Sequence, residues 1–172
     1  MTIRTHFGEH KDESIEKVSL TNYSYLDYLI RKVDLYGEFG RRVHELVYIL
    51  NNYLPYVNCK SCNSTAKNIA IPYQLTHEMK RDYSTKSSSF HCEEQNCLDI
   101  LKEGKYEVYP IKFEIVIGFN KEEGKVLHKI LRRTIGFEND ERVTDKKADE
   151  LILRLEKERL IKPLGQSKLN LF

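Results

Sequence analysis

Four cysteines form two closely spaced pairs in the middle of the chain. The first pair is Cys59-x2-Cys62, and after 29 further residues comes Cys92-x4-Cys97. In each pair the two thiolates lie about one turn apart, so both can reach one ion, and four thiolates give the tetrahedral site that Zn²⁺ accepts in structural positions. Because four protein ligands leave no open coordination position, the spacing predicts a structural Zn²⁺ held by Cys59, Cys62, Cys92 and Cys97.

The compartment affects how these thiols are interpreted. The first residues include several acids and lack the apolar core of a signal peptide. The longest apolar stretch, residues 111–119, contains Lys112 and Glu114 and is far shorter than the roughly 20 residues that span a bilayer. We therefore expect a cytoplasmic protein with no membrane partner, where thiols bind metal more often than they form disulfides. Two alternatives remain: unrelated free thiols, and a redox Cys-x-x-Cys centre, which the lack of a helix start after Pro55 disfavours.

The second pair resembles one known class of metal module. The segment Phe90-His91-Cys92-Glu93-Glu94-Gln95-Asn96-Cys97 is similar to the second knuckle of zinc ribbons appended to DNA topoisomerases, which also place an aromatic residue shortly before the cysteines. The resemblance covers only about 40 residues. It implies strands that carry two knuckles, and often binding of single-stranded nucleic acid. The long spacer leaves an insertion or a treble-clef arrangement open.

Cations and aromatic rings are interleaved around the cysteines. Rings offer faces for base stacking, and cations offer charge to phosphates. The acids and bases of residues 56–104 balance at six each, so protein docking fits this segment as well as nucleic-acid binding does. Residues 105–172 carry 15 bases against 12 acids. The candidate nucleic-acid contacts are Lys60, Lys80, Arg81, Lys86, Phe90, Arg132 and Arg133.

The composition fits a small α+β protein. The chain has 172 residues, 40% of them hydrophobic, with 28 basic and 26 acidic side chains. It is long enough for one ordinary core or two small ones, too apolar to be mainly disordered, and too short for a (β/α)₈ barrel. Its net charge of +2 excludes a polybasic protein. We divide it into an N-terminal helical region (1–55), a zinc-binding module (56–104) and a C-terminal α/β region (105–172).

The N-terminal region contains a sustained apolar stripe. Residues 22–54 read as one long or kinked helix that ends at Pro55, with Gly37 and Gly40 as interruptions; a helical hairpin is the alternative. Because one isolated helix cannot bury the stripe, it must pack on its own domain, on a second copy or on another subunit. The stripe consists of Leu26, Leu29, Val33, Tyr36, Val43, Val47, Leu50 and Leu54.

The rest of the chain predicts a mixture of strands and helices. We expect a short strand at 69–73, a loop or hairpin tip at 84–89, and a strand over 106–119. A helix follows from Asn120 to about 134, and another begins at Thr144 or Asp145 with an apolar face at Ala148, Leu151, Ile152 and Leu155. A final strand at 169–172 would complete a weak resemblance to winged-helix domains, from which the chain departs because no middle helix is evident between residues 136 and 144.

Catalytic motifs are scarce. Neither phosphate-binding glycine loop occurs, and the H-x-E of zinc deaminases at residues 91–93 lacks the downstream P-C-x-x-C. Glu107, Lys112 and Glu114 loosely resemble the carboxylate and lysine placement of nucleases. The interpretation we favour is a zinc-stabilised accessory or adaptor protein that binds nucleic acid in a larger complex. The alternatives are a protein–protein interaction module with purely structural zinc, and a nuclease or nucleotide-modifying enzyme.

Overall fold

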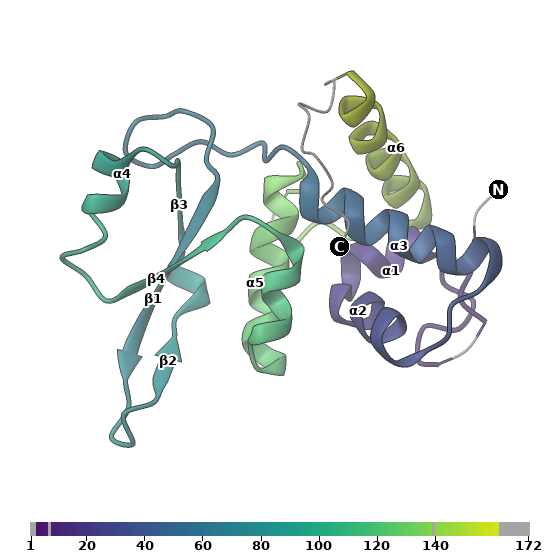
Figure 1. Cartoon of the computed structure of the whole chain (residues 1–172), viewed down its shortest axis with the longest axis horizontal. Coiled ribbons are helices and arrows are strands. Elements are labelled where there is room, and N and C mark those ends of the chain that lie inside the picture. Colours follow the sequence, from purple (N-terminus) through teal and green to yellow (C-terminus); the bar gives the residue numbers. More distant parts are fainter. Residues whose placement is uncertain (1–2, 7, 139, 162–172) are drawn as a thin grey trace, which may run out of the picture.

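The structure is a computed structural model that describes residues 3–6, 8–138 and 140–161. A small antiparallel sheet occupies one side of the molecule and a group of helices the other, with helix α5 between them (Figure 1). This mixture confirms the α+β class. The α-helices are α1 (Ile15–Thr21), α2 (Tyr23–Lys32), α3 (Gly37–Asn52), α4 (Gln95–Asp99), α5 (Lys121–Thr134) and α6 (Asp145–Ile161). The 3₁₀ helices are η1 (Thr85–Ser87) and η2 (Phe113–Gly118), and the strands are β1 (Asn68–Leu75), β2 (Arg81–Tyr83), β3 (Ser89–His91) and β4 (Tyr106–Pro110).

The prediction of one long helix over residues 22–54 is wrong, because the chain turns between α2 and α3. Val33 and Tyr36 are extended, and Gly37 adopts φ +66°, which non-glycine residues rarely occupy. Gly40 permits a close approach, since a Cβ at this position would collide with the backbone carbonyl of Leu35. Gly37 therefore adopts the backbone conformation that the turn requires, and Gly40 lets the turn pack closely onto α3.

The turn folds the apolar stripe onto the protein's own core. Leu26, Leu29, Val43 and Leu50 are fully buried, and α2 and α3 pack against each other and against α1. Tyr36, at 80% exposure, lies on the turn itself. Most of the stripe is therefore covered within the chain, which is the first of the three packing arrangements considered for it, and docking of the 26–54 region on a protein subunit stays a prediction.

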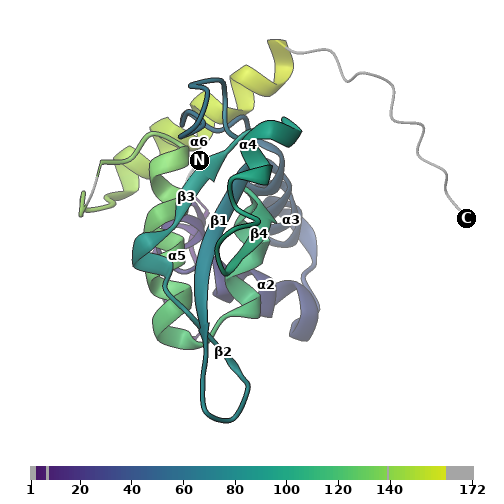
Figure 2. The same ribbon diagram turned by 90° about the vertical axis from the view of Figure 1, so that its left-hand side faces the viewer.

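The sheet is built around β1. β4 pairs antiparallel along residues 68–72 of β1, with Asn68 opposite Pro110. β3 and β2 both pair antiparallel with β1, over Asn68–Ala70 and Tyr73–Leu75 respectively. The strand predicted at 69–73 is thus confirmed, and the β1–β2 hairpin projects from the rest of the sheet (Figure 2).

The strand predicted over residues 106–119 is wrong in its second half. β4 ends at Pro110, which lies opposite the first residue of β1, so the chain has no further partner strand there. Residues 113–118 form η2 instead, and its period of three places Phe113 and Val116 in the core. The alternating side chains that predicted a strand therefore serve two elements, β4 and η2.

The two C-terminal helices confirm their prediction. The side chain of Asn120 accepts hydrogen bonds from the backbone N–H groups of Glu122 and Glu123 and so caps α5. α6 begins at Asp145, and the four predicted residues of its apolar face are buried. The strand predicted at 169–172 lies outside the described residues, so the winged-helix resemblance stays a prediction.

The main core draws on all three segments of the predicted division. It includes Ile15 and Leu46 from the N-terminal helices, Ile69 from β1, Phe113 from η2 and Ile152 from α6, each of them fully buried. Sheet and helices are thus joined by continuous packing. Within the described part of the chain, no helix combines the length and apolarity needed to cross a bilayer.

Candidate metal centre

The first cysteine pair lies on a tight loop before β1. The backbone N–H of Asn63 donates to the Cys59 carbonyl at 3.0 Å, and that of Cys59 donates to the Ser64 carbonyl at 2.6 Å. Asn63 has φ +62°, a conformation that Asn tolerates better than most residues. An isolated bridge between Asn58 and Thr65 closes the loop. The loop thus turns both thiols toward the same point.

The second pair comes from the end of β3 and from α4. Cys92 directly follows β3, and Cys97 lies in α4. The backbone N–H of Lys60 donates to the Phe90 carbonyl at 2.9 Å, and that of Lys67 donates to the His91 carbonyl at 2.8 Å. These two bonds fix the first loop against β3, so the sheet determines the distance between the pairs.

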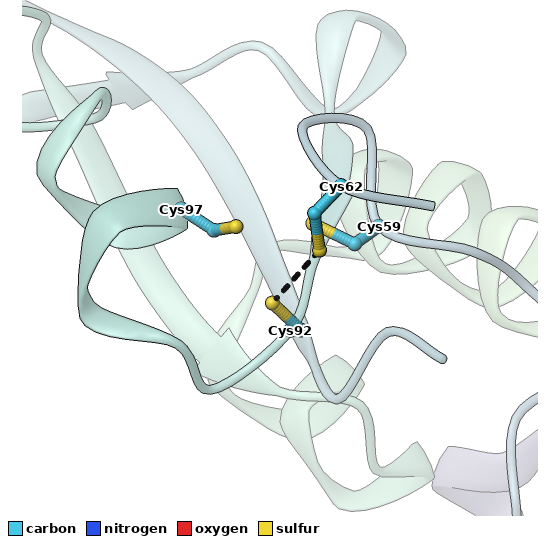
Figure 3. A group of neighbouring side chains, drawn as sticks. All are labelled: Cys59, Cys62, Cys92 and Cys97. Atoms are coloured by element: carbon cyan, nitrogen blue, oxygen red, sulfur yellow. Dashed lines mark hydrogen bonds between the residues drawn. The ribbon is translucent and has the colours of Figure 1, made fainter. Parts of the chain in front are cut away.

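The four thiols converge on one point (Figure 3). Their sulfur atoms all lie within 4.8 Å of one another, and the Sγ atoms of Cys62 and Cys92 are 3.6 Å apart. Tetrahedral Zn–S bonds of 2.3 Å place neighbouring sulfurs roughly 3.8 Å apart, so the observed spacing suits a four-thiolate ion. Cys59, Cys92 and Cys97 are buried, Cys62 is exposed, and all four are free of disulfides. The four-cysteine group is therefore positioned to hold a metal ion.

The thiols differ in their electrostatic environment. Burial of Cys59 opposes ionisation, but hydrogen bonds from the backbones of Cys92, Ser61 and Cys62 lower its pKa to about 5. The Ser64 side chain lowers the pKa of Cys62. The neighbouring thiols of Cys92 and Cys62 raise the pKa of Cys97. A bound dication would stabilise all four cysteines as thiolates. Metal binding would therefore release protons.

Comparison of the chain with protein families, with curated proteins and with solved structures finds no match. The chemistry of the site therefore follows from its own residues. Four sulfur ligands fill a tetrahedral shell, so a bound ion would stabilise the fold and would have no position free for a substrate. The likeness to zinc ribbons stays a prediction.

The structure separates the predicted nucleic-acid contacts into two groups. Lys80 and Arg81 lie on the β1–β2 hairpin and already have acidic partners there and on β4. The Lys80 Nζ is 2.7 Å from a Glu78 carboxylate oxygen, and an Arg81 guanidinium nitrogen is 3.0 Å from one of Glu107. Arg81 also lies over the Tyr73 ring, 4.9 Å from its centroid. These cations are exposed but engaged within the protein.

The second group lines a hollow of about 270 Å³, which we call the basic groove. η1 contacts α5, and this brings Lys86 beside Arg132 and Arg133. Lys129 is the additional cation here, and the signal for it in the sequence is its helical spacing from Arg132 and Arg133. Glu138 and Asp140 also line the groove, leaving four basic and two acidic side chains.

The cations of the basic groove are not equivalent. Lys129 pairs with Asp140 at 2.9 Å. Arg132 is half-buried, donates to the Glu141 carbonyl at 2.6 Å, and lies 4.8 Å from the centroid of the Phe137 ring. Lys86 and Arg133 are both exposed. Arg132 thus fixes the loop after α5, and the other three cations face solvent.

Two further predicted contacts lie elsewhere. Phe90 is half-buried and packs against the main core, so its ring is largely committed to the fold. Lys60 is exposed in the first cysteine loop. Neither residue lines the basic groove.

The carboxylates of the nuclease alternative lie on different elements. Glu107, on β4, interacts with Arg81, and Glu114, on η2, lies 3.7 Å from the Lys112 amine. Among the described residues, only the four cysteines form a group of three or more potential metal ligands. Glu107 and Glu114 therefore belong to no group of three or more potential metal ligands in this part of the chain.

Proposed function

We propose that this protein is a zinc-stabilised accessory protein that binds nucleic acid through the basic groove. The observation that carries the proposal is that η1, from the cysteine-containing region, places Lys86 beside the cations of α5. Residues more than 40 positions apart in the chain thus form one cationic surface. In this arrangement the ion stabilises the region that positions Lys86, and the groove contacts the phosphates.

The charge of the groove supports a backbone-reading contact. Lysine and arginine side chains bind phosphate oxygens with little dependence on base sequence. Phe90 does not line the groove and is not available there for stacking, so electrostatic contacts supply the affinity. The expected binding is sequence-tolerant and falls steeply with salt.

The test is oligonucleotide binding by the zinc-loaded full chain, measured by fluorescence anisotropy over a series of salt concentrations. Single-stranded and duplex probes of the same sequence would show which form is preferred. Lys86→Glu and Arg133→Glu should each weaken binding at low salt and reduce the salt slope by about 1. Lys32→Glu, an equal charge change at the end of α2, is the matched control and should leave binding close to wild type.

Two results would reject the proposal. One is the absence of binding at low salt, and the other is binding that Lys86→Glu and Arg133→Glu leave unchanged. Lys80→Glu adds information, because loss of binding in this variant would extend the contact onto the β1–β2 hairpin.

A protein–protein interaction module is the second candidate, favoured by exposed apolar side chains around the sheet. Met79 on the hairpin is 75% exposed, and Tyr106 and Val108 on β4 are 39% and 42% exposed. A homo-oligomer formed through β4 would bury the last two. Sedimentation equilibrium of the wild type and of Val108→Asp tests this, since a concentration-dependent dimer that the substitution abolishes would support self-association.

A further inference from the structure

Cys62 differs from the other three thiols of the candidate metal centre in its access to water. The other three are between 3% and 6% exposed, whereas Cys62 is exposed. The residues around it, 60–65, are all exposed as well, and its neighbours Ser61 and Asn63 have short side chains. Because the protein surrounding a metal site controls what reaches it from solvent, Cys62 is the sulfur that a dissolved oxidant meets first.

Cys92 provides a second thiol within reach of Cys62. Their Sγ atoms are 3.6 Å apart, in hydrogen-bonding orientation (Figure 3), and must approach by roughly 1.5 Å to reach the length of a disulfide bond. An exposed thiol beside a second thiol is typical of reversibly oxidised cysteines, because the second thiol converts the first oxidation product into a disulfide. Since Cys62 lies before β1 and Cys92 follows β3, such a bond would link the first cysteine loop to β3.

The α4 segment depends most on the metal for its position. Its backbone hydrogen bonds are local, such as the one from the Cys97 N–H to the Glu94 carbonyl at 3.0 Å. Within the described chain, α4 has no extensive contact with another helix or strand, and the buried Leu101 after it does not belong to the main core. The ion pair of Glu93 with Lys67 is solvent-exposed and contributes little. Cys97 is therefore the main link between α4 and the sheet, through the bound ion.

We propose that the four-cysteine centre is a peroxide-sensitive switch, in which oxidation of Cys62 and Cys92 to a disulfide releases the metal and frees α4. The proposal rests on the zinc-binding part of the proposed function and does not require the nucleic-acid contact. In the oxidised protein the disulfide keeps the first cysteine loop attached to β3. Cys59 and Cys97 remain as two ligands, half of the number that a structural zinc site uses.

The oxidant is a hydroperoxide, and the chemistry takes two displacements. The Cys62 thiolate attacks a peroxide oxygen, the O–O bond breaks, and the leaving hydroxide takes a proton to form water, which leaves Cys62 as a sulfenic acid. The Cys92 thiolate then attacks the Cys62 sulfur, the S–S bond forms, the S–O bond breaks, and the second hydroxide takes a proton. Two thiolates, one hydrogen peroxide and two protons thus give one disulfide and two waters. Two electrons pass from the sulfurs to the peroxide, and Zn²⁺ keeps its charge.

The experiment is treatment of the reduced, zinc-loaded full chain with hydrogen peroxide. A chromogenic chelator measures released zinc, mass spectrometry of peptides identifies the disulfide, and hydrogen exchange locates the structural change. The bound zinc should be lost as a Cys62–Cys92 disulfide forms, and dithiothreitol with added zinc should reverse both changes. Amide exchange should rise in α4 and stay low in the first cysteine loop and β3. Removal of zinc from the reduced chain by a chelator should instead raise exchange in all three.

A histidine substitution separates the two roles of Cys62. An imidazole can replace a thiolate as a zinc ligand but cannot form a disulfide. Cys62→His should therefore keep its zinc under a peroxide treatment that empties the wild type. Cys59→His, the same change at the buried sulfur of the same pair, is the matched control and should still lose its zinc. If either variant fails to fold, the disulfide identified in the wild type decides alone.

Several outcomes would overturn the switch and leave the zinc site intact. These are retention of zinc by the peroxide-treated wild type, loss of zinc from Cys62→His at the wild-type rate, and a disulfide within either cysteine pair in place of the Cys62–Cys92 bond. Failure of the reduced chain to bind zinc would be a different result, because it would overturn the zinc site of the proposed function together with the switch.

Discussion

The two sides of the molecule achieve stability by different means. The helical side surrounds large, fully buried side chains, among them Phe113, Leu46 and Leu131. In the region around the cysteines, the second cluster of buried apolar residues in the described chain consists of Cys59, Cys92 and Cys97 themselves. The far end of the sheet therefore has little apolar packing beyond the thiols, and a metal ion would substitute for a core there.

The ion pairs of the two sides differ in how deeply they are buried. Arg42 on α3 contacts Glu16 of α1 at 2.8 Å and Glu156 of α6 at 2.6 Å, and the Glu16 side chain is 8% exposed. On the sheet side, Arg81 and its neighbours form pairs whose cations face solvent. The burial of an ion pair, rather than the number of pairs, should therefore determine how much free energy of unfolding is lost when the pair is broken.

Metal removal is expected to have the largest effect. The free energy of zinc binding to four-ligand sites is on the order of 10 kcal/mol, and its loss should unfold the first cysteine loop, β3 and α4. Hydrogen exchange should show these amides losing protection while α1 and α3 keep theirs. Cys92→Ser should have the same effect, with the exposed Ser61→Ala as control. A purified chain with less than about half an equivalent of metal, and with unchanged exchange in Cys92→Ser, would contradict the comparison.

Truncation of Phe113 tests the other side. Its ring packs near Tyr23, Tyr53 and His128, and Phe113→Ala should reduce the free energy of unfolding by about 3–5 kcal/mol. Chemical denaturation measures this, with half-buried Ile115→Ala as the milder control. The metal content should be unchanged in any folded fraction, and its loss would show that the two sides are not independent.

The cysteine site was predictable because its chemistry depends on local spacing. Cys59-x2-Cys62 and Cys92-x4-Cys97 specify short loops whatever surrounds them, and antiparallel pairing in the sheet then brings the loops together. The caps of α5 and α6 were predictable for the same reason, since Asn120 acts on residues two and three positions away and the Thr144 hydroxyl accepts from the backbone N–H of Lys147, three positions away.

The errors arose where tertiary contacts override a local pattern. The stripe of residues 26–54 fits one long helix and two packed helices equally well, and the contact of Gly40 with Leu35 decides between them only in three dimensions. The alternating apolar and polar side chains after Pro110 likewise fit a strand, but β1 begins opposite Pro110 and has no residues left to pair with them. The basic groove could not be derived from the sequence, because the contact of η1 with α5 is a long-range event.

After metal removal and truncation of Phe113, removal of Arg42 should have the next largest effect on stability. Arg42→Ala leaves the buried Glu16 carboxylate without its cation, and the expected loss is about 3 kcal/mol of unfolding free energy. Arg41→Ala, one residue earlier and 69% exposed, is the control and should have little effect. Equal losses in the two variants would show that burial does not determine the strength of these pairs.

His128 should make the helical side sensitive to acid. Its folded-state pKa of about 4 lies below the value of 6.5 for an unperturbed histidine, so the unfolded chain binds the proton more readily between these values. Stability is then full above pH 6.5 and declines as the pH falls toward 4, by about 2 kcal/mol at pH 5. Denaturation of the wild type and of His128→Gln at a series of pH values measures this. This loss of stability at acidic pH should vanish in His128→Gln and persist in the exposed control His44→Gln.

The smallest effect is expected from Arg81→Ala, which makes it the sharpest test of the comparison. Arg81 has a carboxylate partner at 3.0 Å and an aromatic ring beneath it, much as Arg42 has carboxylates at similar distances. The two arginines differ mainly in their access to water, which hydrates the charge left behind on Glu107 but not the one on Glu16. Arg81→Ala should therefore leave the denaturation midpoint within experimental error. A loss as large as that of Arg42→Ala would mean that the sheet side depends on its ion pairs as well as on its metal.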